Sequence, residues 1–357
     1  MPKKRNTQEI REFILAYIND CKLDMTKAVG EKFEISRQAV AKNIRALIAD
    51  GLIVATGSTR NRKYVLKPLF EHTFSMAITE KVEENQIWLQ EIAPHFKDIK
   101  DNVREICQHG FTEMMNNVID HSLSNTVDIK LWKDAVVIGF CIRDNGIGIW
   151  KKLREKFKLS DSRHAILELA KGKLTTDPEK HTGEGIFFTS RMSDWFSIQS
   201  EDLSYCCSQD GEGWRMDVKE ERAIQGTQVI MEVRLNSEKT IKEVFDKFTS
   251  EYDDFGFSKT QLSIRLAKYE GDHLISRSQA KRILVRLQEF KEVWLDFRDI
   301  THIGQGFADE IFRVFRNAHP DVHLKWVHAS IDVENMILRA MHSIMEQEQQ
   351  QRELPLA

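Results

Sequence analysis

The chain has 357 residues, which is enough for two or three domains of ordinary size. Its 41% hydrophobic and 30% charged residues are typical of a soluble globular protein, and no apolar run approaches the roughly 20 residues that a membrane helix needs. The net charge of −3 is unevenly divided, because residues 1–68 hold fourteen Lys and Arg against seven Asp and Glu. A basic N-terminal part favours contact with a polyanion, although a solvated basic surface would look the same. Without an apolar signal segment at the N-terminus, we expect a cytoplasmic protein that makes no membrane contact.

Three helices and a hairpin are predicted within residues 1–68. Apolar residues recur at helical spacing over 8–21, and a short helix follows from Met25 to Phe33. Ser36 is placed to cap a third helix, which Gly51 ends. Two β-rich runs then flank the turn GSTRNR.

This N-terminal arrangement resembles winged helix-turn-helix DNA-binding domains. The resemblance implies that the third helix enters a major groove of double-stranded DNA and that the hairpin contacts phosphates or a minor groove. The expected contact residues are Arg37, Gln38, Lys42, Arg45, Arg60, Arg62 and Lys63. Use of the same fold for protein contacts remains the alternative.

The middle of the chain divides into two predicted parts. Residues 69–110 are expected to be a helical linker, because apolar residues over 96–106 are spaced to pack against another helix. Residues 111–237 combine helices with strands, since TVDIKLW alternates, AVVIGFCI is apolar and GTQVIMEV follows as a further strand.

Residues 251–346 alternate strand and helix, which predicts an α/β layer. The stretch VWLDFRDITHIGQGFADEIF resembles the core of STAS-like anti-sigma-factor antagonists. Where that family carries a phosphorylated serine, this chain has Gly304-Gln305-Gly306, so we expect docking rather than phosphorylation. The layer would dock on the middle domain of its own chain, on a second copy or on a partner protein. Residues 347–357 are predicted to be a polar, frayed tail.

One polar stripe in the middle region suggests a site. The segment FTEMMNNVIDHS spaces Glu113, Asn117 and His121 at i, i+4 and i+8, which places them on one face of a helix. An acid, an amide and an imidazole suit a magnesium triphosphate, although such a stripe alone is more often a solvated face.

Three glycine-containing segments strengthen this interpretation. RDNGIGI follows an apolar strand, so that the Asp144 carboxylate can accept a hydrogen bond from an exocyclic amine such as that of adenine. HTGEGIFFTSRM leads a glycine turn into a helix N-terminus, which favours phosphate. Gly226-Thr227 opens the last predicted strand.

Together EMMNNVIDH, DNGIGI, TGEGI and GT resemble the conserved boxes of the GHKL ATPases, which include gyrase, heat-shock chaperones, histidine kinases and mismatch-repair proteins. The resemblance covers roughly residues 105–235 and implies a sandwich that holds Mg-ATP under a lid near Lys171 to Thr182. By family position, Asp144 binds the adenine amine, Asn117 binds Mg²⁺ and Glu113 activates water. The implied ATP-binding residues are Asn117, His121, Asp144, Gly146, Gly148, Thr182, Gly183, Gly185, Ile186 and Thr227.

The expected fold is therefore an α/β multidomain protein: a winged helix, a GHKL sandwich with a mixed, mostly antiparallel sheet, and a STAS-like layer. The expected function is an ATP-binding, slowly hydrolysing DNA-binding regulator of transcription. Two alternatives stay open. One is a serine or histidine protein kinase of the anti-sigma or histidine-kinase type, and the other is a DNA-manipulating GHKL ATPase.

Overall fold

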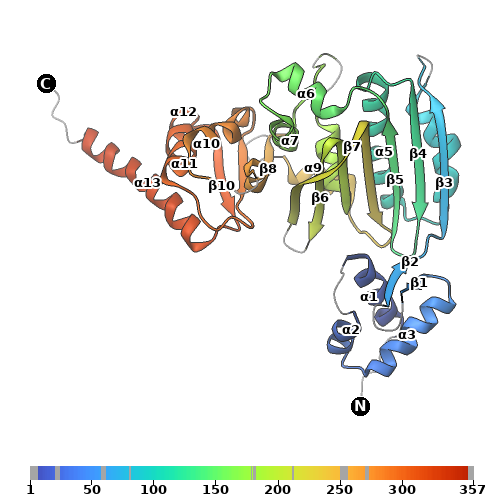
Figure 1. Ribbon diagram of the computed structural model, residues 1–357. Coiled ribbons are helices and arrows are strands. Elements are labelled where there is room, and N and C mark those ends of the chain that lie inside the picture. The colour runs from blue at the N-terminus through green and yellow to red at the C-terminus, as the bar shows by residue number, and fades with distance from the viewer. Residues whose placement is uncertain are drawn as a thin grey trace.

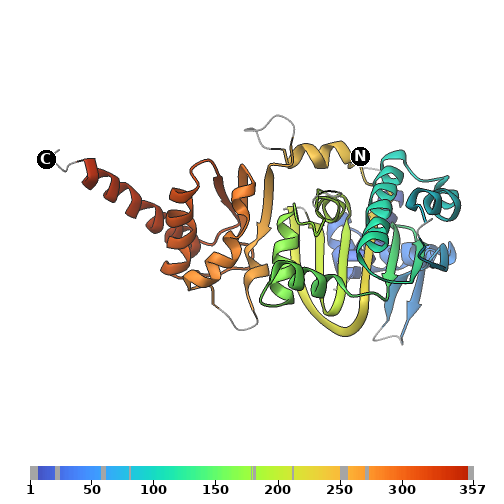
Figure 2. The same cartoon turned by 90° about the horizontal axis from the view of Figure 1, so that it is seen from above.

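The structure, a computed structural model, describes residues 7–20, 25–57, 62–79, 82–177, 179, 182–210, 213–249, 256–269 and 273–352. Three parts follow one another in space (Figure 1): an N-terminal head, a unit built on a five-stranded sheet, and a C-terminal layer. The head lies against one end of the sheet (Figure 1). The layer lies beside the sheet, on the side away from the strand of residues 70–77 (Figures 1 and 2). The chain is thus an α/β protein of several parts, as expected.

The head contains three helices and a two-stranded antiparallel hairpin: α1 (Thr7–Asp20), α2 (Met25–Phe33), α3 (Arg37–Ala49), β1 (Ile53–Thr56) and β2 (Lys63–Leu66). The Ser36 side chain accepts a hydrogen bond from the Ala39 amide and caps α3, as predicted. Gly51 follows the end of α3 with a φ of 72°. The head has its own apolar core, to which Ala135 and Val136 of the sheet unit add partly buried contacts.

The middle unit is a sheet in the order β3-β4-β5-β7-β6, and each of its pairs is antiparallel. Its strands are β3 (Phe70–Ala77), β4 (Thr126–Lys133), β5 (Val137–Asp144), β6 (Trp195–Asp210) and β7 (Gly213–Arg234). The long helix α5 (Asp101–His121) packs on β5 and β7, and α8 (Gly185–Met192) packs on β6 and β7. Helix α9 (Ile241–Lys247) contacts α5 and α8. Helices α6 (Ile149–Phe157) and α7 (Ser162–Lys171) contact β6.

The expectation of a helical linker over residues 69–110 is wrong in its first part. Residues Phe70–Ala77 form strand β3, which pairs with β4 along its full length. Its residues alternate between half-buried and exposed, the period of a strand with one covered face. Short helical turns follow, α4 (Glu84–Ile87), η1 (Trp88–Ile92) and η2 (Ala93–Phe96). Helix α5 then continues unbroken across residue 110.

Strand β7 also differs from the expectation. Gly226 and Thr227 do not open a strand but lie within the 22 residues of β7, beside an irregularity in its pairing with β6 around Ser200 and Glu201. A bulge of this kind bends a long strand and re-aims its side chains, which suits a position next to a site.

The C-terminal layer is built on a parallel sheet in the order β10-β9-β8, and the parallel strand pairs found among the described residues lie here. Its elements are β8 (Lys259–Ser263), η3 (Ile264–Ala267), α10 (Arg277–Leu284), η4 (Leu287–Glu289), β9 (Glu292–Asp296), α11 (Gln305–Asp309), η5 (Glu310–Phe315), α12 (Arg316–Ala318), β10 (His323–Val327) and α13 (Ile331–Arg352).

Two features of this layer were not expected from the sequence. Helix α13 continues to Arg352 and projects away from the layer (Figure 1), so residues 347–352 of the predicted polar tail are helical. Their Gln, Glu and Arg residues are good helix formers. In addition, a single apolar core runs from Ile87 through the sheet unit into the layer as far as Ala340. The layer is therefore packed on the sheet unit rather than tethered to it.

Candidate functional site

A cavity of about 310 Å³ lies in the middle unit, between α5, α6 and the N-terminus of α8 on one side and strands β5 and β7 on the other. Apolar side chains form much of its wall: Met114, Val118, Ile142, Leu153, Leu169, Leu174, Ile198 and Val229. The polar residues come from four separate segments of the chain: Glu113, Asn117, His121, Ser122, Asp144, Lys152, Thr175, Thr176, Thr182 and Thr227.

Asp144 is the last residue of β5 and is 4% exposed at the cavity. Its Oδ1 atom accepts hydrogen bonds from the Gly146 amide at 2.8 Å and from the Thr227 amide at 3.3 Å. Burial raises the pKa of this carboxyl, and the two backbone hydrogen bonds oppose that rise. The carboxylate is thus fixed in position by amides of the DNGIGI and Gly226-Thr227 segments, both of which were predicted to belong to one site.

Gly146, one of the implied ATP-binding residues, does not line the cavity. A Cβ atom at this position would lie 1.9 Å from the Ser122 carbonyl oxygen, so glycine is required for the turn to pack against the end of α5. Its amide serves the site indirectly, through the hydrogen bond to Asp144. Gly148, by contrast, does line the cavity.

The predicted stripe of α5 faces the cavity, since Glu113, Asn117 and His121 all line it. The Asn117 amide nitrogen donates to the Glu113 carbonyl at 2.9 Å, which orients the side chain and leaves Oδ1 as its acceptor atom. The Glu113 carboxylate lies against the start of α8, because a Cβ atom on Gly185 would fall 2.0 Å from its Oε2. A larger residue at 185 would require the Glu113 carboxylate to move.

A further part of the cavity lining comes from residues 174–176 and from Thr182 and Gly183, and we call residues 172–176 the wall segment. Leu174, Thr175 and Thr176 of the wall segment line the cavity. Lys171, where we expected a lid to begin, instead ends helix α7 and is completely buried. Residues 178, 180 and 181 of the expected lid are outside the described residues.

Lys152 is a cavity residue that the sequence analysis missed. It lies in the first turn of α6, half-buried, and its Nζ donates to the His121 carbonyl at 2.8 Å. Burial lowers its pKa, while the charges of Asp120 and Asp177 oppose the shift. The sequence already pointed to this residue, because Lys152 comes four residues after Gly148. It therefore falls in the helical turn that begins at the end of the DNGIGI segment.

The residues expected to contact DNA are found on one helix and on the hairpin of the head. Arg37, Gln38, Lys42 and Arg45 are all exposed on α3. The Arg45 Nε donates to the Ala41 carbonyl of its own helix, at 3.3 Å. Arg62 and Lys63 are exposed at the start of β2, and Arg60 is outside the described residues. Apart from Gln38, these exposed side chains are basic.

Comparison with known families identifies the C-terminal layer. Residues 279–334 match the model of a family described as a STAS-like domain of unknown function (DUF4325). The match runs from α10 to the first residues of α13 and confirms the STAS-like interpretation of this part. No curated protein matches the chain. Within the described residues, no helix is both long and apolar enough to cross a bilayer.

Proposed function

We propose that this protein binds Mg-ATP in the cavity and that the bound nucleotide regulates DNA binding by the head. The observation that carries the proposal is Asp144, a buried carboxylate that is fixed by two backbone amides and lines a largely apolar cavity. Apolar walls suit a purine ring, and a buried carboxylate can accept a hydrogen bond from its exocyclic amine. This interpretation makes the middle unit a GHKL-type ATPase domain.

Other groups of the same cavity are suited to the phosphates. Lys152 and His121 supply one cation and one imidazole, and Thr182 and the N-terminal end of α8 supply hydroxyl and amide donors. Glu113 lies at the boundary between the α5 stripe and the α8 terminus, where it would orient a water molecule for attack on the terminal phosphate.

The donor set also suits magnesium. No cluster of three or more His, Cys, Asp or Glu side chains that could hold a metal exists in the part of the chain that the structure describes. Mg²⁺ in nucleotide sites typically needs only one or two protein oxygens besides phosphates and waters. Asn117 Oδ1 is the protein oxygen that would hold it, and the bound ion would neutralise phosphate charge.

The head would respond through the sheet. Val136, which packs against the core of the head, directly precedes β5, and Asp144 ends the same strand. Eight residues of extended strand span about 24 Å, so one stiff element joins the cavity to the seat of the head. We infer that nucleotide occupancy changes how the head is held against the β4–β5 turn. The basic surface of α3 would then meet double-stranded DNA, as a transcriptional regulator requires.

The test is a pair of titrations on the full chain. Mg-ATP binding is measured by calorimetry for the wild type, for Asp144→Asn and for Asp202→Asn, a control at an exposed acid. We expect Asp144→Asn to weaken binding by roughly 10- to 150-fold, because a charge-assisted hydrogen bond contributes ~1.5–3 kcal/mol. Genomic DNA fragments are then titrated with ATP, ADP or no nucleotide present. Equal ATP affinity for a folded Asp144→Asn variant rejects the nucleotide assignment, and equal DNA affinity in all three conditions rejects the regulation.

A further inference from the structure

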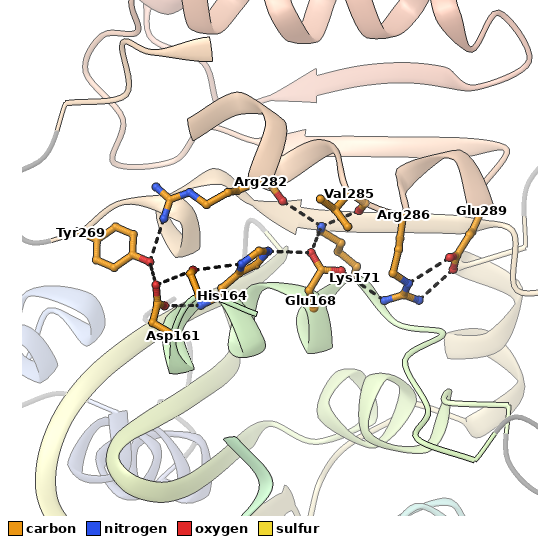
Figure 3. A network of polar contacts seen from close by, with 10 residues as sticks. Asp161, His164, Glu168, Lys171, Tyr269, Arg282, Val285, Arg286 and Glu289 are labelled. Atoms are coloured by element: carbon orange, nitrogen blue, oxygen red, sulfur yellow. Dashed lines mark hydrogen bonds and ion pairs between the residues drawn. The ribbon is translucent and has the colours of Figure 1, made fainter. Parts of the chain in front are cut away.

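Helix α7 is shared between the cavity and the C-terminal layer. Leu169 lines the cavity, whereas Glu168 and Lys171 of the same helix face the layer (Figure 3). The Lys171 Nζ donates to Glu168 at 2.5 Å and to the Val285 carbonyl, at the end of α10, at 2.7 Å. From the other side, the Thr260 hydroxyl of β8 donates to the Lys171 carbonyl at 2.8 Å. The layer therefore contacts the helix that contributes Leu169 to the cavity lining.

Arg286 extends this contact to the wall segment, residues 172–176. Its Nη2 donates to the Gly172 carbonyl at 3.1 Å and to the Lys173 carbonyl at 2.5 Å. These two residues directly precede Leu174, which lines the cavity. The acceptors are main-chain atoms of the wall, so the guanidinium group fixes the path of the backbone rather than a side chain.

The guanidinium group is itself held in place within the layer. Arg286 adopts a left-handed backbone conformation, with a φ of 63°, and its Nε and Nη2 donate to the Glu289 carboxylate at 3.1 and 2.9 Å (Figure 3). In return, Lys173 of the wall segment donates to the Glu289 carbonyl at 3.0 Å and lies over the Phe290 ring. The wall segment and residues 286–290 thus contact each other through three hydrogen bonds and one cation–ring contact.

We propose that Arg286 is a positioning residue for the nucleotide cavity. Through Arg286 the STAS-like layer holds the wall segment closed, so that packing of the layer on the sheet unit is coupled to nucleotide retention. The inference rests on the proposed function. Since binding free energies are reciprocal, a layer that favours the closed wall must itself be held more firmly when nucleotide is bound. A partner that displaced residues 286–290 would release the wall and the nucleotide together.

The interface supplies a matched control. Arg282 belongs to the same polar network, but its side chain donates to the Tyr269 hydroxyl at 2.9 Å, at the end of the network near Asp161 and away from the wall segment (Figure 3). Arg282→Gln removes the same charge from the same interface, and it leaves the Arg282 carbonyl in place for Lys171. A general loosening of the layer would therefore affect both variants.

The experiment measures affinity and dissociation rate of a fluorescent ATP analogue for the wild-type full chain, Arg286→Gln, Arg286→Lys and Arg282→Gln. We expect Arg286→Gln to dissociate the nucleotide about tenfold faster, within the range usual for coupled sites. Arg286→Lys keeps the charge but loses the fixed set of N–H donors of the guanidinium group, so it should restore part of the nucleotide retention. Arg282→Gln should match the wild type.

A second measurement covers the case in which a variant fails to fold. Hydrogen exchange of the wild-type chain should slow both at the wall segment and at residues 286–290 when Mg-ATP is added. Wild-type dissociation rates in folded Arg286→Gln, or no change of exchange at residues 286–290 on nucleotide binding, would overturn the inference and leave the ATP site intact. Absence of nucleotide binding by the wild-type chain itself overturns both.

Discussion

Glu168 and Lys171 form an ion pair across one turn of α7, with Oε1 and Nζ 2.5 Å apart and with side chains 2% and 0% exposed. Burial lowers the pKa of Lys171 to about 8, although the Glu168 charge opposes the shift. For Glu168, burial would raise the pKa, but His164, Lys171 and Arg286 outweigh it and the pKa is lowered. The pair is thus charged at neutral pH and lies between the cavity and the C-terminal layer.

Removing one charge of this pair should destabilise the protein more than removing both charges. Lys171→Met leaves Glu168 with a buried charge, and we expect a loss of about 3–5 kcal/mol in the free energy of unfolding. The double variant Glu168→Gln with Lys171→Met removes both charges and should lose clearly less than the sum of the single changes. Urea denaturation of the four chains completes the cycle, and simple additivity would contradict a coupled pair.

The pair also predicts how stability changes with pH. In the folded chain Lys171 has a pKa of about 8, against 10.5 in the unfolded chain. Between these values the unfolded state binds the additional proton, so the free energy of unfolding should rise as pH increases from 8 to 10.5. The double variant lacks this lysine and should lack this part of the rise. Equal pH slopes for both proteins would show that the Lys171 pKa is unshifted.

Lys152 should contribute to binding of the phosphates of ATP and not of its adenine base. We expect Lys152→Gln to weaken ATP binding about tenfold or more, because a charge-assisted hydrogen bond contributes ~1.5–3 kcal/mol, and to leave adenosine binding unchanged. The neighbouring Lys151 is exposed and Lys151→Gln serves as the control. Calorimetry with ATP and adenosine separates the two effects, and equal losses for both ligands would indicate a packing defect instead.

Glu113 should act on turnover and not on binding. Glu113→Gln should retain ATP affinity and lose hydrolysis by a factor of ~10² to 10⁴, the usual effect of a lost general base. Glu105→Gln, at an exposed acid two turns earlier on α5, is the control. Incubation with γ-labelled ATP shows where the phosphate goes: free phosphate supports the ATPase, whereas labelled protein would support the protein-kinase alternative.

The basic face of α3 should carry DNA binding. Arg45→Ala should lose ~1–3 kcal/mol of affinity if its guanidinium group reads a base. Arg143→Ala, at an exposed arginine on β5, is the control. Fluorescence anisotropy at several salt concentrations gives both affinity and salt slope. A chain of residues 69–357 that binds DNA as tightly as the full chain would refute the assignment to the head.

The sequence was most informative where local chemistry determines the structure. Ser36 caps α3, and Asp144 ends β5, because a capping hydroxyl and an apolar run followed by a glycine turn act over a few residues. The alternation that predicts β3 was present but outweighed by the helical spacing farther along. Lys171 could not be placed, because charged side chains are almost never fully buried unless a distant segment supplies partners. Those partners, Val285 and Arg282, are more than a hundred residues away.

The two separate apolar cores determine how the protein should melt. Three parts are visible in the sequence, but the sheet unit and the C-terminal layer share one core, while the head has its own. Heating should therefore produce two cooperative transitions instead of three, one for the small head and one for everything after it. Excising the STAS-like layer for separate study would cut through a core, whereas removing the head would cut the chain between β2 and β3 and uncover Ala135 and Val136 of the sheet unit.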